Sequence, residues 1–538
     1  MADPPPPELP SLAGADWLTR ADTRAVFDAL AARGYAARAV GGAVRNALLG
    51  RPVIDVDIAT PAHPDEVIAA ARAAGLAAQP TGIAHGTVTV IAGHVAHEVT
   101  TLRQDIEAHG RHATVAFTDD WAADARRRDF TINALYCSAN GEVFDPLGGR
   151  ADVAARRVRF IGEARERIRE DYLRILRFFR LTAEYGQGPP DKEGLAACVA
   201  ERDGLTRLSG ERVRQEMLRL LAAPRGPELV RAMQEFGLLG FVLPAAPRPG
   251  LLSHLAAIEA RLGVAADAVL RLAALVVELP EDADRLRERL RLANEEHARL
   301  RHSTVRAPDV GPAADIRIAR GDLYANGAAA YRARVLLAWA RSGDAPEDPA
   351  WQHRYTLPER WQPPRFPLGG GDVMAAGLAP GPRVGELLRA LEAWWIAGDF
   401  MADEMALRAK LQQMTGECPA AAASHQRALA LLGDLGNRLG QAEALNRLGE
   451  LSLRTSAAGQ ARDQHTRALA IARDIRAAPE EARALEGLGR AHIQDRHHDQ
   501  GLDCLRQALT IYQRIGAPAA QRVRETLVSP SAAEHRTT

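Results

Sequence analysis

Two aspartates one residue apart follow a glycine turn near the start of the chain, and they could hold metal ions. The turn is Val40-Gly-Gly-Ala-Val-Arg-Asn46, and the aspartates lie in Ile54-Asp-Val-Asp-Ile58. The pattern predicts a strand, a turn, a short helix and a second strand. Side chains alternate faces along a strand, so Asp55 and Asp57 should point the same way. Paired carboxylates beside free backbone N–H groups suit hard cations and phosphate, which predicts metal-assisted chemistry on a nucleotide.

The composition narrows the class of protein. The chain has 538 residues, 25% of them charged, and basic and acidic residues are equal in number. A nucleic-acid partner would therefore need a local basic face rather than overall basicity. Four cysteines without a CxxC pair fit neither a disulfide framework nor a zinc site. No apolar run approaches the ~18 residues of a membrane span, and no signal-peptide pattern is present. We expect a cytoplasmic protein.

The first part of the chain mixes helices and strands, and these elements must position the aspartates. An amphipathic helix is expected over Arg20–Arg33, before the glycine turn. Apolar runs predict strands or similar elements at Val53–Ile58, Gly86–Ile91, His97–Leu102, Phe130–Cys137 and Gly141–Phe144.

The rest of the chain is helical in period from about Arg156 onwards. From about Met414 it repeats every 40 residues: Arg427-Ala-Leu-Ala-Leu431, Arg467-Ala-Leu-Ala-Ile471 and Gln507-Ala-Leu-Thr-Ile511. Two helices per unit with small residues at the crossings resemble a tetratricopeptide array. About two and a half units are fewer than an independent solenoid usually needs, so we expect this segment to dock onto another surface, a protein partner included.

Three motifs occur together in the order typical of one family. They are Gly41-Gly-Ala-Val-Arg-Asn46, Asp55-Val-Asp57 and Arg127-Arg-Asp-Phe-Thr-Ile-Asn133. Over residues 17–413 the chain resembles the bacterial class II tRNA nucleotidyltransferases, or CCA-adding enzymes, which are related to bacterial poly(A) polymerases. The resemblance implies an α+β protein with a small mixed α/β head of the polymerase-beta-like type, an extended all-α neck, body and tail, and then the helical repeats.

The resemblance also divides the chain. The predicted segments are a disordered N-terminus at 1–12, the nucleotidyltransferase head at 13–150, a helical neck with base-templating and tRNA-binding elements at 151–250, an RNA-binding helical body and tail at 251–413, repeats at 414–528 and a disordered end at 529–538.

Catalytic roles follow by matching positions in the family. The resemblance implies that Asp55 and Asp57 hold two Mg²⁺ ions, one activating the primer 3′-hydroxyl and one bridging the nucleotide phosphates. Glu98 matches the third catalytic carboxylate. For the aspartate pair, the alternative is a solvated strand end. For Glu98 alone, a plain strand residue is the alternative.

Nucleotide-binding roles follow in the same way. Gly41, Gly42 and Arg45 match a triphosphate cradle, because glycine lets backbone amides approach phosphates closely. Arg128 and Asp129 match a ribose-recognition motif, in which a carboxylate accepts from the 2′-hydroxyl. A plain tight turn and a surface salt bridge are the respective alternatives.

In the family, recognition of the base belongs to a different segment. Asp171 and Arg174 are predicted to share a helix face, and in the family this pair templates the incoming base. The Asp acceptor beside the Arg donor complements the amino donor and ring-nitrogen acceptor of cytosine and adenine, and it opposes guanine and uracil, in which donor and acceptor are exchanged. An ordinary i,i+3 ion pair is the alternative. Arg212 and Glu216 match residues that brace the templating helix as structural support.

Two positions depart from the family pattern. Many relatives carry Asp where this chain has Asn46. In the predicted flexible loop Glu107-Ala-His-Gly-Arg-His112, His109 replaces a common Asp, while Gly110 and Arg111 remain. This makes the addition of the terminal A a less direct inference than the addition of CC.

The function implied is template-independent addition or repair of the tRNA 3′-terminal CCA from CTP and ATP, with release of pyrophosphate. The helical region would hold the acceptor arm of the tRNA by shape and phosphate contacts. One alternative is a poly(A) polymerase, and another is an enzyme that adds only CC. An alternative of a different class is an interaction protein built on the repeats, with an attached head.

Overall fold

The computed structural model describes residues 9–107, 114–304, 309–376, 380–415, 418–454 and 457–528. The chain forms two compact units. Unit 1 comprises Met1–Ala314 and Ala328–Leu357, and unit 2 comprises Asp315–Gly327 and Pro358–Thr538. No helix in the described ranges is long and apolar enough to cross a membrane.

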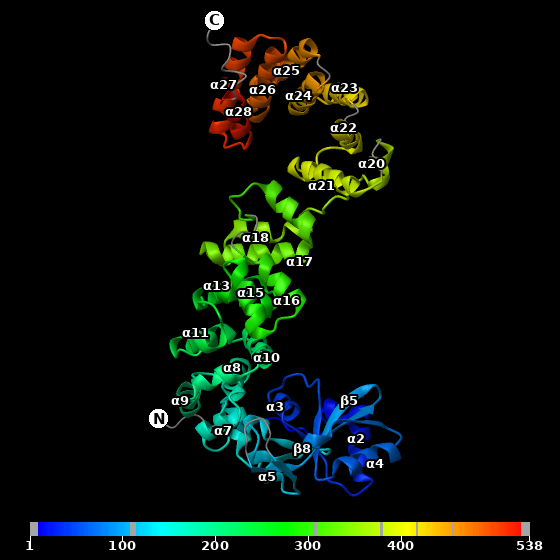
Figure 1. The fold of residues 1–538 in the computed structure, drawn as a ribbon. Coiled ribbons are helices and arrows are strands. Elements are labelled where there is room, and N and C mark those ends of the chain that lie inside the picture. The colour runs from blue at the N-terminus through cyan, green and yellow to red at the C-terminus, as the bar shows by residue number, and fades with distance from the viewer. Residues whose placement is uncertain are drawn as a thin grey trace. The chain divides into compact units, whose positions relative to one another are not determined.

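The head in unit 1, drawn in blue to cyan in Figure 1, is built on a seven-stranded mixed sheet in the order β3-β4-β5-β2-β1-β8-β9. All neighbours are antiparallel except β2 and β5, which run parallel. The strands are β1 Arg38–Val40, β2 Asp57–Thr60, β3 Ala77–Gly82, β4 Thr87–Ala92, β5 Val95–Thr101, β8 Tyr136–Ser138 and β9 Val143–Phe144. A separate hairpin pairs β6 Arg103–Glu107 with β7 Thr114–Phe117.

Alternation of apolar residues along the strands determines which face of this sheet is covered by helices. Along β4 every second residue is buried, and helices α2 and α4 pack against β4 and β5. The helices of the head are α1 Asp16–Thr19, α2 Ala21–Ala31, α3 Gly42–Leu48, α4 Pro64–Ala73, α5 Trp121–Arg126 and α6 Gly149–Ala154, with short 3₁₀ turns at Ile83–His85 and Thr131–Asn133. The mixed head predicted from the sequence is confirmed.

Two predicted elements differ in extent. The strand expected over Val53–Ile58 begins only at Asp57, because its partner β1 ends at Val40, opposite Asp57, where Gly41 turns the chain away with φ +71°. Residues 53–56 thus lack a strand beside them in this sheet. The apolar run Phe130–Cys137 divides into the 3₁₀ turn and strand β8.

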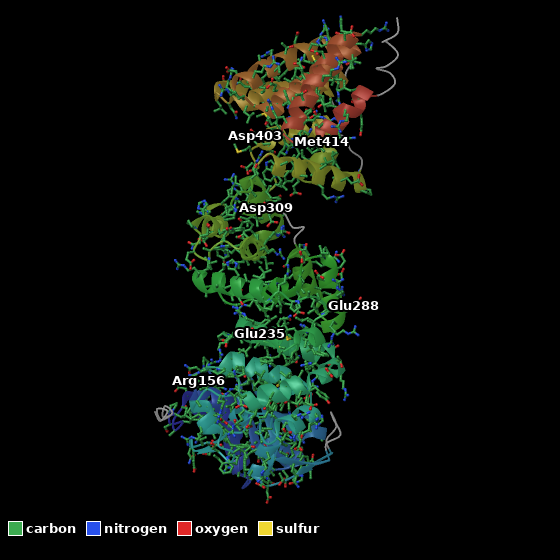
Figure 2. All side chains as sticks on the ribbon, turned by 90° about the vertical axis from the view of Figure 1, so that its left-hand side faces the viewer. Arg156, Glu235, Glu288, Asp309, Asp403 and Met414 are labelled. Atoms are coloured by element: carbon green, nitrogen blue, oxygen red, sulfur yellow. The ribbon has the colours of Figure 1, made fainter. Side chains whose placement is uncertain are left out.

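Three phenylalanines in mutual contact attach helix α8 to the head. Phe130 belongs to the head, Phe160 to the segment that follows it and Phe178 to the middle of α8, and their ring centroids are 4.7–6.3 Å apart. Such pairs contribute roughly 0.5–1.5 kcal/mol each beyond the area they bury. Just beyond the end of α8, the N–H of Gln187 donates a hydrogen bond of 2.9 Å to the backbone carbonyl of Arg156, which is labelled in Figure 2. The middle of α8 and the residues after it are therefore held by the head and the segment that follows the head.

The remainder of unit 1 is helical, as predicted. Its helices are α7 Ala164–Glu170, α8 Leu173–Tyr185, α9 Lys192–Ala200, α10 Gly210–Ala222, α11 Gly226–Glu235, α12 Leu239–Val242, α13 Pro249–Leu262, α14 Ala268–Val276, α15 Pro280–Leu290, α16 Asn294–His302, α18 Pro349–Tyr355 and a 3₁₀ turn at Arg202–Arg207. Helix α17, Ile316–Ser342, is broken at Gly327, where φ is +76°, and α19 spans Leu357–Arg360. The division between the two units falls at this break.

Unit 2 begins with a small helical cluster and continues into the repeats. Leu368, Val373, Leu391, Trp395 and Leu407 form an apolar core. The helices of this part are α20 Gly370–Ala375, α21 Pro382–Ala397 and α22 Glu404–Thr415.

The repeat segment consists of helices that recur every 20 residues. They are α23 Cys418–Asp434, α24 Arg438–Arg454, α25 Ala458–Asp474, α26 Ala478–Gln494, α27 His498–Arg514 and the shorter α28 Ala519–Val528. Each helix packs on the next, so two helices fill the 40-residue period seen in the sequence. A Cβ at Gly449 or Gly487 would lie 2.3 Å from the ring of His465, which explains the small residues at these crossings.

His465 gives the repeats a pH-dependent stability. It is fully buried, and burial lowers its pKa from 6.5 to about 4. An unfolded chain would take up a proton near pH 6.5 whereas the folded one would not, so stability should fall between pH 6.5 and 4, by about 3 kcal/mol. We predict that His465→Leu, the residue type found at Leu505 one period later, reduces this dependence of the melting temperature; a remainder is expected from the buried His425 one period earlier, whose pKa burial also lowers to about 4. An equal acid sensitivity in the variant would contradict the prediction.

The repeats should also be separable from the activity that the family resemblance implies. We predict that a chain ending at Gln413 keeps kcat/KM for that activity within about threefold, because the unit 2 core around Trp395 and all of unit 1 lie before that point. Steady-state kinetics on a tRNA primer, the substrate that the resemblance implies, measure this. Loss of turnover in a truncated chain that melts at the same temperature would refute it.

Candidate active site

A large arginine-rich cleft in unit 1 is lined both by the head and by the helices that follow it. Its volume is about 1110 Å³. The lining includes ten arginines and five acidic residues, so the cleft is strongly positive and suits a polyanionic ligand. The acidic residues are Asp55, Asp57, Asp129, Asp171 and Glu184.

The paired aspartates open into this cleft. Asp55 and Asp57 are exposed while Val56 between them is 2% exposed, so both side chains point to one side, as predicted. Glu98 is exposed on β5 and sits level with Asp57, because Ile58 pairs with Val99 across the parallel strands. Glu98 adjoins the pair, but it is not among the residues that line the cleft.

These carboxylates fit a hard divalent cation. Within the described residues, neither Asp55 nor Asp57 accepts a hydrogen bond or forms an ion pair. Although the Asp57 side chain is open to the cleft, the surrounding protein partly desolvates its carboxylate. This desolvation and the like charges of Glu98 and Asp55 raise the pKa of Asp57, against the opposing charge of Arg128. No cluster of three or more metal-ligating side chains occurs in the described ranges. Two carboxylates completed by ligand phosphates are the usual Mg²⁺ arrangement.

The glycine turn follows β1 as predicted, and Gly41 and Gly42 both line the cleft. Gly42 begins α3, whose first N–H groups have no partner within the helix. Arg45 is 7% exposed and donates to Asn46 and to the Tyr185 hydroxyl, the latter at 2.8 Å, and also to Asn133. The structure therefore brings Arg45 to the cleft with most of its donors already in use.

Asp129 is held by three donors. Its carboxylate accepts from the Asn133 amide at 3.0 Å, from the Phe130 N–H at 2.9 Å and from Arg177 Nε at 2.7 Å. Burial opposes ionisation, but the charge of Arg177 and these hydrogen bonds outweigh it and lower the pKa of Asp129. The group is an ionised, fixed acceptor. Its neighbour Arg128 is instead paired with Asp124 at 3.1 Å.

Asp171 and Arg174 both line the cleft, but the expectation that they share one helix is wrong. Asp171 lies between α7 and α8 with an extended backbone, φ −153°, and only Arg174 is inside α8. The break lets the Asp171 carboxylate accept two hydrogen bonds from Arg212, at 3.1 and 2.6 Å. Such a fork fixes the orientation of the carboxylate.

Helix α8 carries two cleft residues that sequence reasoning missed, Arg177 and Arg180. With the predicted Arg174 they line the cleft at three-residue steps, a spacing visible in the sequence. Arg180 Nε donates to Glu216 of α10 at 2.5 Å, so Arg212 and Glu216 both contact the segment they were predicted to support. Asn133 and Tyr185 were also missed. The predicted loop residues Gly110 and Arg111 lie outside the described residues.

Comparison with known protein families finds two matches along the chain. Residues 37–159 match the poly A polymerase head domain family, and residues 190–248 match the family described as the probable RNA and SrmB-binding site of polymerase A. These matches cover the head with its aspartates and the helices that follow α8. They define a nucleotidyltransferase of the poly(A) polymerase head type.

Individual relatives narrow this class. The chain is 32% identical to the mitochondrial CCA tRNA nucleotidyltransferase 1 of Danio rerio over 70% of this chain and 87% of that protein. It is 42% identical to the CCA-adding enzyme of Geobacillus thermodenitrificans over 38% of this chain and 50% of that one. The solved Bacillus stearothermophilus CCA-adding enzyme in complex with CTP covers 73% of this chain at 27% identity, with a TM-score of 0.56. The chain belongs to the CCA-adding enzyme and poly(A) polymerase family.

The free carboxylate pair gives a first prediction for catalysis. If Asp55 and Asp57 hold the metal as predicted, Asp55→Asn should abolish incorporation of every nucleotide, because one of the two carboxylates that would bind the ion is lost. The melting temperature should stay the same or rise, since a like charge beside Asp57 is removed. Incorporation of labelled nucleotide and thermal melting measure the two effects. The matched control is Asp28→Asn, at an exposed position of α2 outside the cleft lining. Residual incorporation above one per cent in Asp55→Asn would contradict the assignment.

Proposed function

We propose that this protein completes and repairs the 3′-terminal CCA of tRNA from CTP and ATP without a nucleic-acid template, releasing pyrophosphate. The observation that carries the proposal is one cleft lined both by the carboxylates of the head and by Asp171 and Arg174 at the start of α8. The residues proposed for chemistry and those proposed for base recognition thus line one cleft.

Base selection would rest on Asp171 and Arg174. Cytosine and adenine each present an amino donor beside a ring-nitrogen acceptor, which a carboxylate and a guanidinium complement. A carboxylate can accept about four hydrogen bonds. Arg212 uses two of them and the Leu173 N–H a third, so acceptor capacity for about one hydrogen bond from the base remains. Guanine or uracil would leave polar groups unpaired, a cost of about 1–3 kcal/mol each.

Asp55 and Asp57 would hold Mg²⁺, with Glu98 beside them as the third catalytic carboxylate. The ions supply a Lewis acid for the attacking hydroxyl and for the leaving phosphates. The N–H of Gly42, at the start of α3, would receive the triphosphate, while the N–H of Gly41 donates to the Leu135 carbonyl at 3.1 Å and Gly41 serves to turn the chain. Asp129, already fixed and ionised, would accept from the ribose 2′-hydroxyl.

The helical region after the head would hold the acceptor arm of the tRNA. The family match over residues 190–248, described as a probable RNA-binding site, supports this assignment. We further propose a cytoplasmic enzyme whose tetratricopeptide-like repeats recruit a protein partner. Cell fractionation and affinity capture with and without residues 414–538 test these two points.

The deciding experiment uses purified enzyme and tRNAs lacking A, CA or CCA, with each nucleotide supplied separately and then together. We predict two C additions from CTP alone, one A addition on a tRNA ending in CC, and no product longer than the completed CCA. Extension by ATP alone beyond one residue would favour the poly(A) polymerase alternative. Failure to add A after CC would establish the CC-adding alternative.

Arg212 provides a test of base selection that leaves the reacting groups in place. Arg212→Ala frees the Asp171 carboxylate, so the ratio of kcat/KM for CTP over UTP should fall about tenfold, the effect of one hydrogen bond to a charged group. Single-turnover incorporation of each nucleotide measures it. The matched control is Arg225→Ala, which removes an arginine–glutamate pair outside the cleft lining. An unchanged ratio would contradict the role of Asp171.

A further inference from the structure

Two cations share one aromatic ring where the small helical cluster of unit 2 meets the repeats. The ring belongs to Trp394 on α21. The ammonium of Lys410 on α22 lies 5.8 Å from its centroid, and the guanidinium carbon of Arg447 on α24 lies 5.1 Å from it. The face of an indole attracts cations and so helps to place both side chains, but the ring has no negative charge that could neutralise them.

Arg447 has no carboxylate partner of its own. Among the residues that the structure describes, its guanidinium forms neither a hydrogen bond nor an ion pair, although it is only partly exposed. Desolvation by the surrounding protein lowers the pKa of Arg447. The nearby carboxylate of Glu480 is already engaged, because it accepts from Asn446 and from Arg483, each at 2.9 Å. A partly desolvated cation without a hydrogen-bonded partner is unfavourable, so Arg447 is ready to receive an anion.

His425 on α23 adds a buried polar atom beside these cations. Its side chain is 7% exposed, and its Nε2 has no hydrogen-bond partner within the described part of the chain. Burial and the positive charges of Arg447 and Lys410 lower the pKa of His425 to about 4, against the charge of Glu450, so the ring is neutral at pH 7. We call Trp394, Lys410, His425 and Arg447 the junction cluster.

The charges around the junction cluster alternate in sign, which favours one kind of ligand. Glu443, Arg447 and Glu450 share a face of α24 by their spacing, and the charges of Glu480 and Arg483 on α26 also act on Arg447. A nucleic-acid strand needs an excess of positive charge along its whole path. A nearly balanced face with one unpaired guanidinium instead suits a peptide that presents a carboxylate at that point.

We propose that the junction cluster binds a carboxylate from an acidic segment of a partner protein. The inference deepens the part of the proposed function in which the repeats recruit a protein, and it rests on that part. Arg447 donates to the carboxylate, Lys410 adds positive potential, and Trp394 holds the two cations in place. Trp394 and Lys410 precede the repeats while His425 and Arg447 lie within them, so the site exists only where the two are joined.

Fluorescence anisotropy with the full chain tests the site directly. The probe is a labelled eight-residue peptide of alternating glutamate and alanine, and its neutral counterpart carries glutamine in place of glutamate. The glutamate peptide should bind at least tenfold more tightly than the glutamine peptide, the effect of one hydrogen bond between charged groups. Arg447→Gln should weaken binding of the glutamate peptide about tenfold, and Lys410→Gln about threefold.

Arg467→Gln is the matched control, because it removes the same charge from an exposed position on α25. Its affinity for the glutamate peptide should equal that of the parent chain. All three variants should melt near the parent temperature and keep the parent kcat/KM for nucleotide addition, because none of these residues lines the cleft of unit 1.

Three results would overturn the inference: equal affinity for the two peptides, no measurable binding up to roughly 1 mM, or an affinity unchanged in Arg447→Gln. Tighter binding of an eight-nucleotide uridylate oligomer, lost in Arg447→Gln, would also overturn it and assign the site to RNA. These binding measurements do not depend on catalysis. Failure of the parent enzyme to add C to a tRNA lacking CCA would therefore refute the proposed activity without refuting the site.

Discussion

The arrangement depends on keeping two carboxylates unneutralised inside a cleft lined by ten arginines. Asp55 and Asp57 can take a cation only if the surrounding guanidinium groups are bound elsewhere. Six of the ten arginines have dedicated acceptors: Arg127 and Arg128 pair with Asp124, Arg177 with Asp129, Arg174 with Glu170, Arg212 with Asp171 and Arg180 with Glu216. These pairs lower the local potential, but arginines still outnumber the carboxylates around the cleft, so a net positive charge remains to attract a triphosphate.

The same pairs explain why helix α8 occupies its position. Its cleft-facing arginines bond to Asp129 in the head and to Glu216 on α10, while Phe178 stacks on Phe160. Polar contacts on one side and aromatic packing on the other hold one orientation of the helix. The residues proposed to read the base are therefore held at a fixed position relative to the proposed metal site. Protein groups can select a base directly only if that position is fixed.

The sequence predicted local features well and tertiary pairings poorly. Asp55, Asp57 and the glycine turn were identifiable because a short strand and a turn leave clear marks within a few residues. The break at Asp171 was missed because helical spacing is equally consistent with a continuous helix, and only the pairing with Arg212, 41 residues away, shows why the backbone extends there. The partners of Arg45 were missed for the same reason, since Tyr185 is 140 residues distant. Contacts between remote segments leave no mark in a single sequence.

The most direct test of the central claim is anomalous diffraction from crystals soaked with Mn²⁺ and a non-hydrolysable CTP analogue. We predict manganese bound by the carboxylates of Asp55 and Asp57, the triphosphate against the turn at Gly41 and Gly42, and the cytosine edge facing Asp171 and Arg174. Manganese bound away from the two aspartates, or a base that does not reach the start of α8, would contradict the account.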